Sequence, residues 1–124
     1  MIGGNVSLIS LTGLEGLNSI NGDLNIGGHY ANANPALISL AALQELTSIG
    51  GNLEITYNDA LTSLTGLDNV TSIGGDLRIN DNHELISLLG LDSVTTIGGS
   101  LRIDNNDALS SLFELDGLTS IGGD

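Results

Sequence analysis

The tripeptide Ile-Gly-Gly recurs at a fixed interval, and this periodicity constrains the fold more than any other feature of the chain. Ile49, Ile73, Ile97 and Ile121 are separated by 24 residues each time, and each is followed by two glycines. Such a repeat is typical of a solenoid, in which every repeat forms one turn and packs only against its neighbours. We therefore expect identical side chains to lie directly above one another in successive turns.

Aliphatic residues follow the same period and predict an apolar interior. Aromatic residues make up only 2% of the chain, so its core has to be built from stacked Leu, Ile and Val side chains. The columns with the 24-residue spacing include Leu53, Leu77 and Leu101; Ile55, Ile79 and Ile103; Leu37, Leu61, Leu85 and Leu109; and Leu40, Leu64, Leu88 and Leu112.

The residues after each glycine pair alternate between polar and apolar, as in Asp76-Leu77-Arg78-Ile79. A period of two indicates a strand with one buried face. Successive strands should pair in parallel, about 4.8 Å apart. The glycine pair itself marks a corner, because glycine tolerates both positive φ and the close approach of another backbone.

One periodic column is polar and consists of Asn34, Asn58, Asn82 and Asn106. An amide at a corner of the coil can both donate to and accept from the backbone groups of adjacent turns. We therefore assign this asparagine ladder a structural role.

The repeat divides the single domain, residues 1–124, into segments. When Ile2 is aligned with Ile20, the interval is six residues short, which predicts an abbreviated first coil over 1–19. Residues 20–48 form a coil with an insertion near 27–33, which contains His29 and Tyr30. Three regular coils follow over 49–120, and 121–124 begin a truncated coil, giving about five coils in all.

The charge balance excludes several classes of partner. Two Lys and Arg residues against 15 Asp and Glu residues give a formal net charge of −13, which should repel nucleic acid and anionic lipid surfaces. There is no apolar run long enough to insert in a membrane, and no signal peptide. The chain has no cysteine and neither a nucleotide-binding glycine motif nor a nucleophile elbow, so we expect no enzyme activity, no cofactor and no metal.

The pattern Leu53-x-Ile55-x-x-Asn58-x-x-Leu61, repeated at 77–85 and 101–109, is similar to the strand-and-asparagine core of leucine-rich repeats. The fuller unit LTSIGGNLEITYNDALTSLTGLDNV resembles the receptor L-domain type of leucine-rich-repeat solenoid and the repeats of bacterial surface proteins. The resemblance implies an all-β, right-handed parallel β-solenoid located outside the cell or at its surface and used for recognition or adhesion. It carries over no fixed functional residue.

Candidate binding residues come from the outward strand positions and from the insertion. The only two cations of the Lys/Arg type, Arg78 and Arg102, are one period apart in the column that begins with Glu54. They could grip one anion together, or Glu54, Asp76 and Asp104 could neutralise them on a solvated face. The tentative ligand-binding set is Glu54, Thr56, Arg78, Asn80, Arg102 and Asp104, with His29, Tyr30 and Tyr57 as an aromatic anchor at the edge.

Two further interpretations rest on other polar positions. Asp59, Asp81, Glu84, Asp104 and Asp107 approach one another at the corners and could bind calcium, although no EF-hand spacing is completed. Columns of Thr47, Thr71, Thr95 and Thr119 and of Ser39, Ser63, Ser87 and Ser111 could match an ice lattice or could form hydrogen bonds along the turns.

We therefore expect a non-enzymatic recognition or adhesion module that binds protein or glycan through the outward strand face. The other interpretation is a structural spacer, a fragment of a longer repeat protein. An uncapped solenoid end exposes strand edge and aliphatic surface, so end-to-end self-association is a further expectation.

Overall fold

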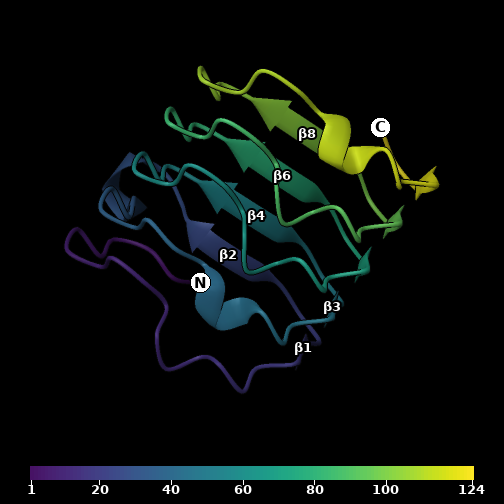
Figure 1. Cartoon of the computed structure of the whole chain (residues 1–124), viewed down its shortest axis with the longest axis horizontal. Coiled ribbons are helices and arrows are strands. Elements are labelled where there is room, and N and C mark those ends of the chain that lie inside the picture. Colours follow the sequence, from purple (N-terminus) through teal and green to yellow (C-terminus); the bar gives the residue numbers. More distant parts are fainter.

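The computed structural model describes all residues from 1 to 124 and is a parallel β-solenoid with almost no helix (Figure 1). Two parallel sheets run along it. One has four strands, which are β2 (Leu24–Gly27), β4 (Leu53–Thr56), β6 (Leu77–Asn80) and β8 (Leu101–Asp104). The other has five shorter strands, which are β1 (Ser19–Ile20), β3 (Ser48–Ile49), β5 (Ser72–Ile73), β7 (Thr96–Ile97) and β9 (Ser120–Ile121).

The only helical segments are three 3-10 turns of three residues each. They are η1 (Tyr30–Asn32), η2 (Ala41–Leu43) and η3 (Phe113–Leu115). No helix is long and apolar enough to cross a membrane.

The strand register confirms that every twenty-fourth residue lies above its predecessor. Ile55 pairs with Ile79, and Ile79 pairs with Ile103, without any slip. The short strands keep the same offset, so Ile49, Ile73 and Ile97 stack in one column. The result is three regular turns between Ile49 and Ile121, each of 24 residues.

The aliphatic columns form one continuous core along the solenoid. Leu53, Leu64 and Leu88 are fully buried, as are their neighbours in the middle turns. The strand alternation is confirmed on β6, where Leu77 and Ile79 are buried and Arg78 is exposed. Leu101 and Ile103, on the edge strand β8, are only partly buried because no further strand pairs with that edge.

The asparagine ladder is confirmed as part of this interior. The Nδ2 atom of Asn82 donates to the carbonyl oxygens of Ile55 (2.9 Å) and Asn80 (3.1 Å), and its Oδ1 accepts from the backbone N–H of Asn58 (3.0 Å). Asn106 repeats all three contacts one turn later. Asn58 repeats the two donations one turn earlier, and its Oδ1 accepts from Nδ2 of Asn34. Each amide thus replaces backbone hydrogen bonds that the corner interrupts.

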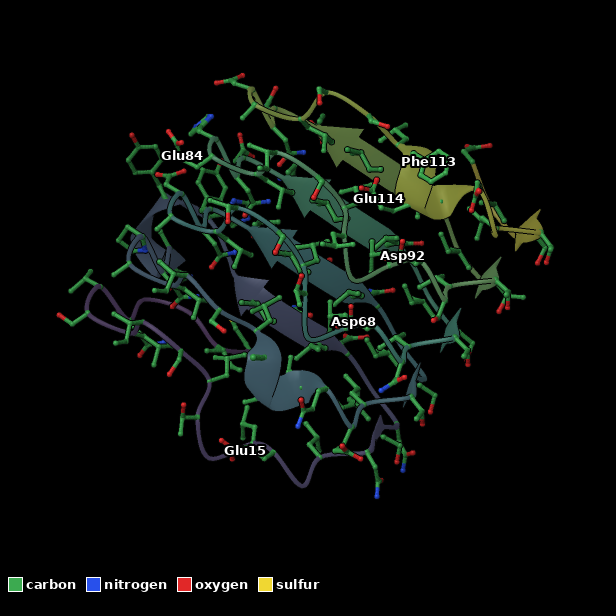
Figure 2. The ribbon with its side chains drawn as sticks, viewed as in Figure 1. Glu15, Asp68, Glu84, Asp92, Phe113 and Glu114 are labelled. Atoms are coloured by element: carbon green, nitrogen blue, oxygen red, sulfur yellow. The ribbon has the colours of Figure 1, made fainter.

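The paired glycines are required by close approach and not by left-handed backbone. A Cβ atom added to Gly74 would overlap the carbonyl oxygen of Gly50 in the turn before it, and Gly98 meets Gly74 in the same way. Positive φ is needed elsewhere, at Gly66 (116°) and Gly90 (112°). There the glycine N–H donates to the carboxylate two residues on, Asp68 after Gly66 and Asp92 after Gly90, both labelled in Figure 2.

The start of the chain differs from our alignment. Ile2 forms a bridge with Ile26, so it belongs to the column of long-strand isoleucines, and its alignment with Ile20 is wrong. From Ile2 to Ile26 the spacing is the regular 24 residues. Asn5 accordingly lies at the start of the asparagine ladder, where its backbone N–H donates to Oδ1 of Asn34 at 3.2 Å. The misleading signal is Gly3-Gly4, which imitates the corner motif.

We predict that Gly74→Ala destabilises the fold, because its methyl group has to displace the backbone of the preceding turn. Overpacking of this kind costs about 1–3 kcal/mol of unfolding free energy. The matched control is Gly16→Ala, at a glycine with normal φ and open space around it, which should change stability by less than about 0.5 kcal/mol. Urea denaturation of both variants measures the difference, and equal effects would refute close packing at the corner.

A second prediction concerns the ladder. Asn82→Ala leaves the N–H of Asn58 and the carbonyl oxygens of Ile55 and Asn80 without the amide. Each unsatisfied buried group costs about 1–3 kcal/mol, so the loss should exceed that of any exposed asparagine. Asn21→Ala, at an exposed side chain, is the control. Similar melting temperatures for the two variants would show that the ladder contributes little.

Candidate functional site

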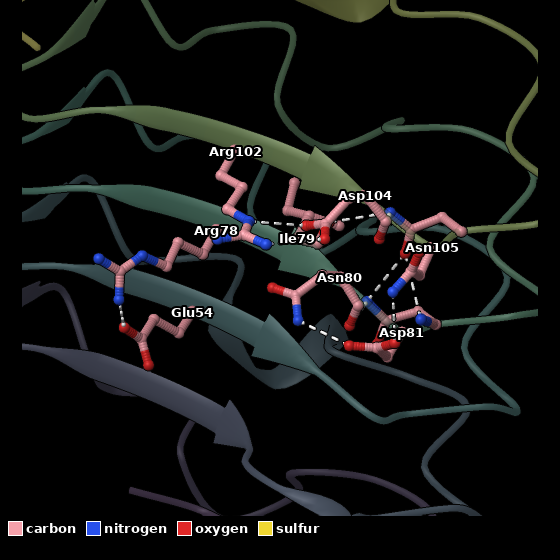
Figure 3. Close-up of polar contacts among 10 residues, drawn as sticks. Glu54, Arg78, Ile79, Asn80, Asp81, Arg102, Asp104 and Asn105 are labelled. Atoms are coloured by element: carbon pink, nitrogen blue, oxygen red, sulfur yellow. Dashed lines mark hydrogen bonds and ion pairs between the residues drawn. The ribbon is translucent and has the colours of Figure 1, made fainter. Parts of the chain in front are cut away.

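The outward face of the four-stranded sheet brings six of the expected site residues together. In-register pairing aligns Glu54, Arg78 and Arg102 in one column. The second column contains Thr56, Asn80 and Asp104. Figure 3 shows Glu54, Arg78, Asn80, Arg102 and Asp104 on three neighbouring strands. The face is therefore polar across its width.

Each arginine on this face is held by carboxylates. Arg78 lies 2.9 Å from Glu54 on the neighbouring strand and 2.7 Å from Asp76, through different nitrogen atoms. Arg102 donates from Nε and a terminal nitrogen to the two oxygens of Asp104, both at 3.1 Å. This hydrogen bond and the charge of Asp104 raise the pKa of Arg102. The ion pairs match the neutralised, solvated face that was one of the two alternatives.

The insertion forms a wall beside this face. Gly27 still pairs with Thr56, and the N–H of Asn34 already bonds to the carbonyl of Tyr57 at 3.2 Å, so the five surplus residues are 28–32. They carry η1 and project Tyr30, whose exposed fraction is 89%. The ring of Tyr30 meets that of Tyr57 edge-on, with centroids 5.9 Å apart and planes at 61°. The aromatic pair expected from the sequence is thus present.

A polar hollow of about 310 Å³ lies between the strand face and this wall. Its lining includes Asn25, Thr56 and Arg78 from the strands, and His29 and Asn32 from the insertion. The Oδ1 atom of Asn25 is buried and has no hydrogen-bond partner within the chain. Buried acceptors in native proteins are nearly always satisfied, so this unpartnered oxygen is the unusual polar group of the hollow.

Three residues that follow the long strands have left-handed backbone. Tyr57, Asp81 and Asn105 occupy equivalent positions in successive turns, with φ of 57°, 57° and 54°. Asn and Asp tolerate this conformation, whereas a bulky residue rarely adopts it. Tyr57 is therefore the exception in its column, and strain of this kind costs about 1–3 kcal/mol.

The charges around Tyr57 are set by Asp81. Desolvation and the nearby Asp81 carboxylate raise the pKa of Tyr57, so its phenol stays neutral. For Asp81, partial burial works toward a higher pKa, but hydrogen bonds from Asn80 (2.8 Å), Asn105 (3.0 Å) and Tyr57 outweigh it and lower the pKa. Asp81 is thus a firmly ionised carboxylate beside a neutral ring.

A second hollow, of about 370 Å³, lies on the other side of Tyr57. Tyr30, Val6 and Pro35 give it apolar and aromatic walls, and Asp59 and His83 are its titratable residues. Tyr57 lines both hollows and so separates them.

Three of the five acidic residues considered for calcium, Asp81, Asp104 and Asp107, are engaged in other contacts. His83 Nδ1 lies 2.9 Å from Asp107, and Asp81 accepts from Asn105. No group of three or more acidic or histidine side chains is arranged to hold a metal ion. Glu84, labelled in Figure 2, is exposed at the corner after β6.

The hydroxyl columns also make contacts within the chain. Thr95 and Thr119 donate to the carbonyl oxygens of Thr71 and Thr95, at 3.2 and 2.9 Å, in the turn before each. The hydroxyl oxygens of Ser39 and Ser111 accept from backbone N–H groups two residues later in their turns. These bonds support the structural interpretation of both columns.

Sequence reasoning missed Asn25, Asn32 and the second hollow. Asn25 occupies the same outward strand position as Glu54, so an alignment of the two strands in the sequence was sufficient to place it on this face. Asn32 lies in the insertion, where no repeat fixes the backbone, so no periodic signal indicated its position.

The fold and the two hollows define the chain as a parallel β-solenoid with a polar strand face. In comparisons with known proteins, no protein-family model, curated protein or solved structure matched the chain.

We predict that Asp81 contributes stability that is lost in acid. Its folded pKa is lowered, so the contribution is complete above the ordinary Asp value near 4 and disappears as the pH falls through the folded pKa. The difference in unfolding free energy between the wild type and Asp81→Asn should be constant at neutral pH and shrink below about pH 4. Asn suits the left-handed backbone here, as Asn105 shows.

Denaturant titrations at a series of pH values check this, with Asn105→Ala as the companion variant. That substitution removes one of the donors to Asp81 and should make the wild-type pH dependence shallower. A pH-independent difference between wild type and Asp81→Asn would contradict the assignment.

Proposed function

We propose that the chain is a non-enzymatic recognition module that binds glycan through the outward strand face and its polar hollow. The observation that carries the proposal is the buried, unpartnered Oδ1 of Asn25, a residue that lines a hollow rich in amides. Sugar hydroxyls are both donors and acceptors, and they match a site in which Asn, Thr, Glu and Arg alternate. A volume of about 310 Å³ is at the small end of the usual range for ligand pockets.

The wider strand face supports the same proposal for an extended ligand. Glu54, Arg78 and Arg102 repeat in register, so a chain molecule running along the solenoid axis meets similar groups in each turn. A protein ligand would use the same surface. Solenoids generally bind their ligands on such extended surfaces, where similar side chains recur at regular intervals.

We also propose the finer classification that the repeat motif implies. The asparagine ladder and the 24-residue period support a leucine-rich-repeat solenoid of receptor L-domain type, right-handed and of about five coils. Such a protein would act at the cell surface or outside the cell, in recognition or adhesion.

The competing proposal is a spacer without a ligand, a fragment of a longer repeat protein. End-to-end self-association is compatible with either role. It is supported by the exposure of Leu112, Phe113 and Ile121 in the last turn, with Phe113 labelled in Figure 2. Calcium binding receives less support, because no three acidic or histidine side chains are arranged to hold a metal ion, and ice binding receives less because the threonine hydroxyls bond within the chain.

A glycan array tests the recognition proposal. We expect selective binding that falls at least tenfold in Asn25→Ala and in Arg78→Ala, since both side chains line the hollow. Asn25→Ala should leave stability nearly unchanged, because the Oδ1 atom makes no hydrogen bond in the free protein.

The matched control is Arg102→Ala, which removes the same residue type from the same column but outside the hollow. Binding retained in this variant locates the ligand at the hollow, and binding lost in it extends the site along the face. No selective binding by the wild type would favour the spacer.

A further inference from the structure

The second hollow concentrates nearly all the aromatic surface of the chain. The protein has two tyrosines, one phenylalanine and no tryptophan, and both tyrosines line this hollow. Tyr30 projects from the insertion with 89% of its surface exposed, and its ring leans edge-on against Tyr57. In an edge-on pair the edge of one ring covers part of the face of the other, so the π surface left open to the hollow is mainly that of the exposed Tyr30.

The electrostatic environment of these rings is strongly negative. Asp59 lines the hollow, and the ionised Asp81 carboxylate lies beside Tyr57. No Lys or Arg is among the lining residues, and the ring of His83 is paired with Asp107. The formal net charge of −13 adds a long-range attraction for cations.

The backbone at Tyr57 is a second, independent observation. The equivalent residues in the next two turns are Asp81 and Asn105, which suit left-handed backbone, whereas a tyrosine there is strained. A residue that breaks the local rule of its column is most often retained for function. Its ring divides the two hollows, so the strain places an aromatic surface where an amide would otherwise be.

We propose that this hollow, between Tyr30 and Tyr57, binds the guanidinium or ammonium group of a side chain on a basic polypeptide. The cation lies against the tyrosine faces, with Asp59 and Asp81 as its counter-charges. Cations are bound by such rings through their quadrupole, and the attraction increases when carboxylates are close by. The site shares Tyr57 with the strand-face hollow, but it does not depend on glycan binding.

Proton NMR provides the test, because the chain has only two sets of tyrosine ring signals to assign. The probe is a blocked Gly-Gly-Arg-Gly-Gly peptide, titrated to millimolar concentration at two salt concentrations. We expect saturable shifts of both tyrosine signals, and ring-current shifts of the arginine side-chain protons. A peptide with norleucine in place of arginine should produce neither.

Four variants separate a specific site from general attraction to an acidic protein. Tyr30→Phe keeps the π face and should bind normally, whereas Tyr30→Leu keeps an apolar wall and should bind about three- to thirty-fold more weakly. Asp59→Asn should bind more weakly and show a shallower salt dependence. Tyr57→Asn should lose binding while melting at the same temperature as the wild type or higher, because Asn suits the left-handed backbone.

Arginine-peptide binding that is equal in Tyr30→Leu, or equal for the norleucine peptide, overturns the proposal. Retention of binding in Tyr57→Asn overturns it as well. None of these outcomes affects the glycan test, in which the informative variants are Asn25→Ala and Arg78→Ala, outside this hollow.

Discussion

The close stacking of one turn on the next is the constraint on which the rest of this structure depends. Parallel strands about 4.8 Å apart leave no room for a side chain between the corner backbones, so the corner positions have to be glycine. Gly74 under Gly98 shows this directly, since a methyl group on either would overlap a carbonyl oxygen. The same spacing brings each ladder amide within reach of the turn before it, as with Asn82 and the carbonyl of Ile55. The glycine column and the asparagine column therefore both follow from the short distance between successive turns.

Stacking also determines what the surface can offer. A register without slip converts one outward residue per repeat into a column, and therefore into a line of similar groups along the solenoid. On the strand face these lines are polar and their charges largely cancel, through pairs such as Arg102 and Asp104. The shaped sites arise where the repetition is broken. Both hollows border residues 28–32, and both include Tyr57, the residue least suited to its backbone conformation.

Periodicity made most of the fold predictable. The parallel pairing, the asparagine ladder and the buried columns of the middle turns were inferred correctly, because each follows from identical neighbours at a fixed interval. Leu112, in the last turn of its column, is exposed. The misplacement of Ile2 has a physical reason, since Gly3-Gly4 imitates the corner motif, whereas Gly3 stacks on Gly27 at the end of a long strand. The sites were predicted less completely. The pairs of Arg78 follow from the repeat, but Tyr30 and Asn32 lie in the insertion, whose backbone has no repeating neighbour to fix it. The position of Asn32 and the shape of both hollows are therefore seen only in the structure.

The insertion has a consequence for how this kind of surface can diversify. Five additional residues leave the pairing of Gly27 with Thr56 on one side and the contact of Asn34 with Asn58 on the other undisturbed. The number of residues in the loop at this corner therefore does not affect the pairing of the turns, as in a scaffold whose display loop can be exchanged. A protein built in this way can acquire a new specificity through changes in a single short loop, while the regular turns stabilise the fold.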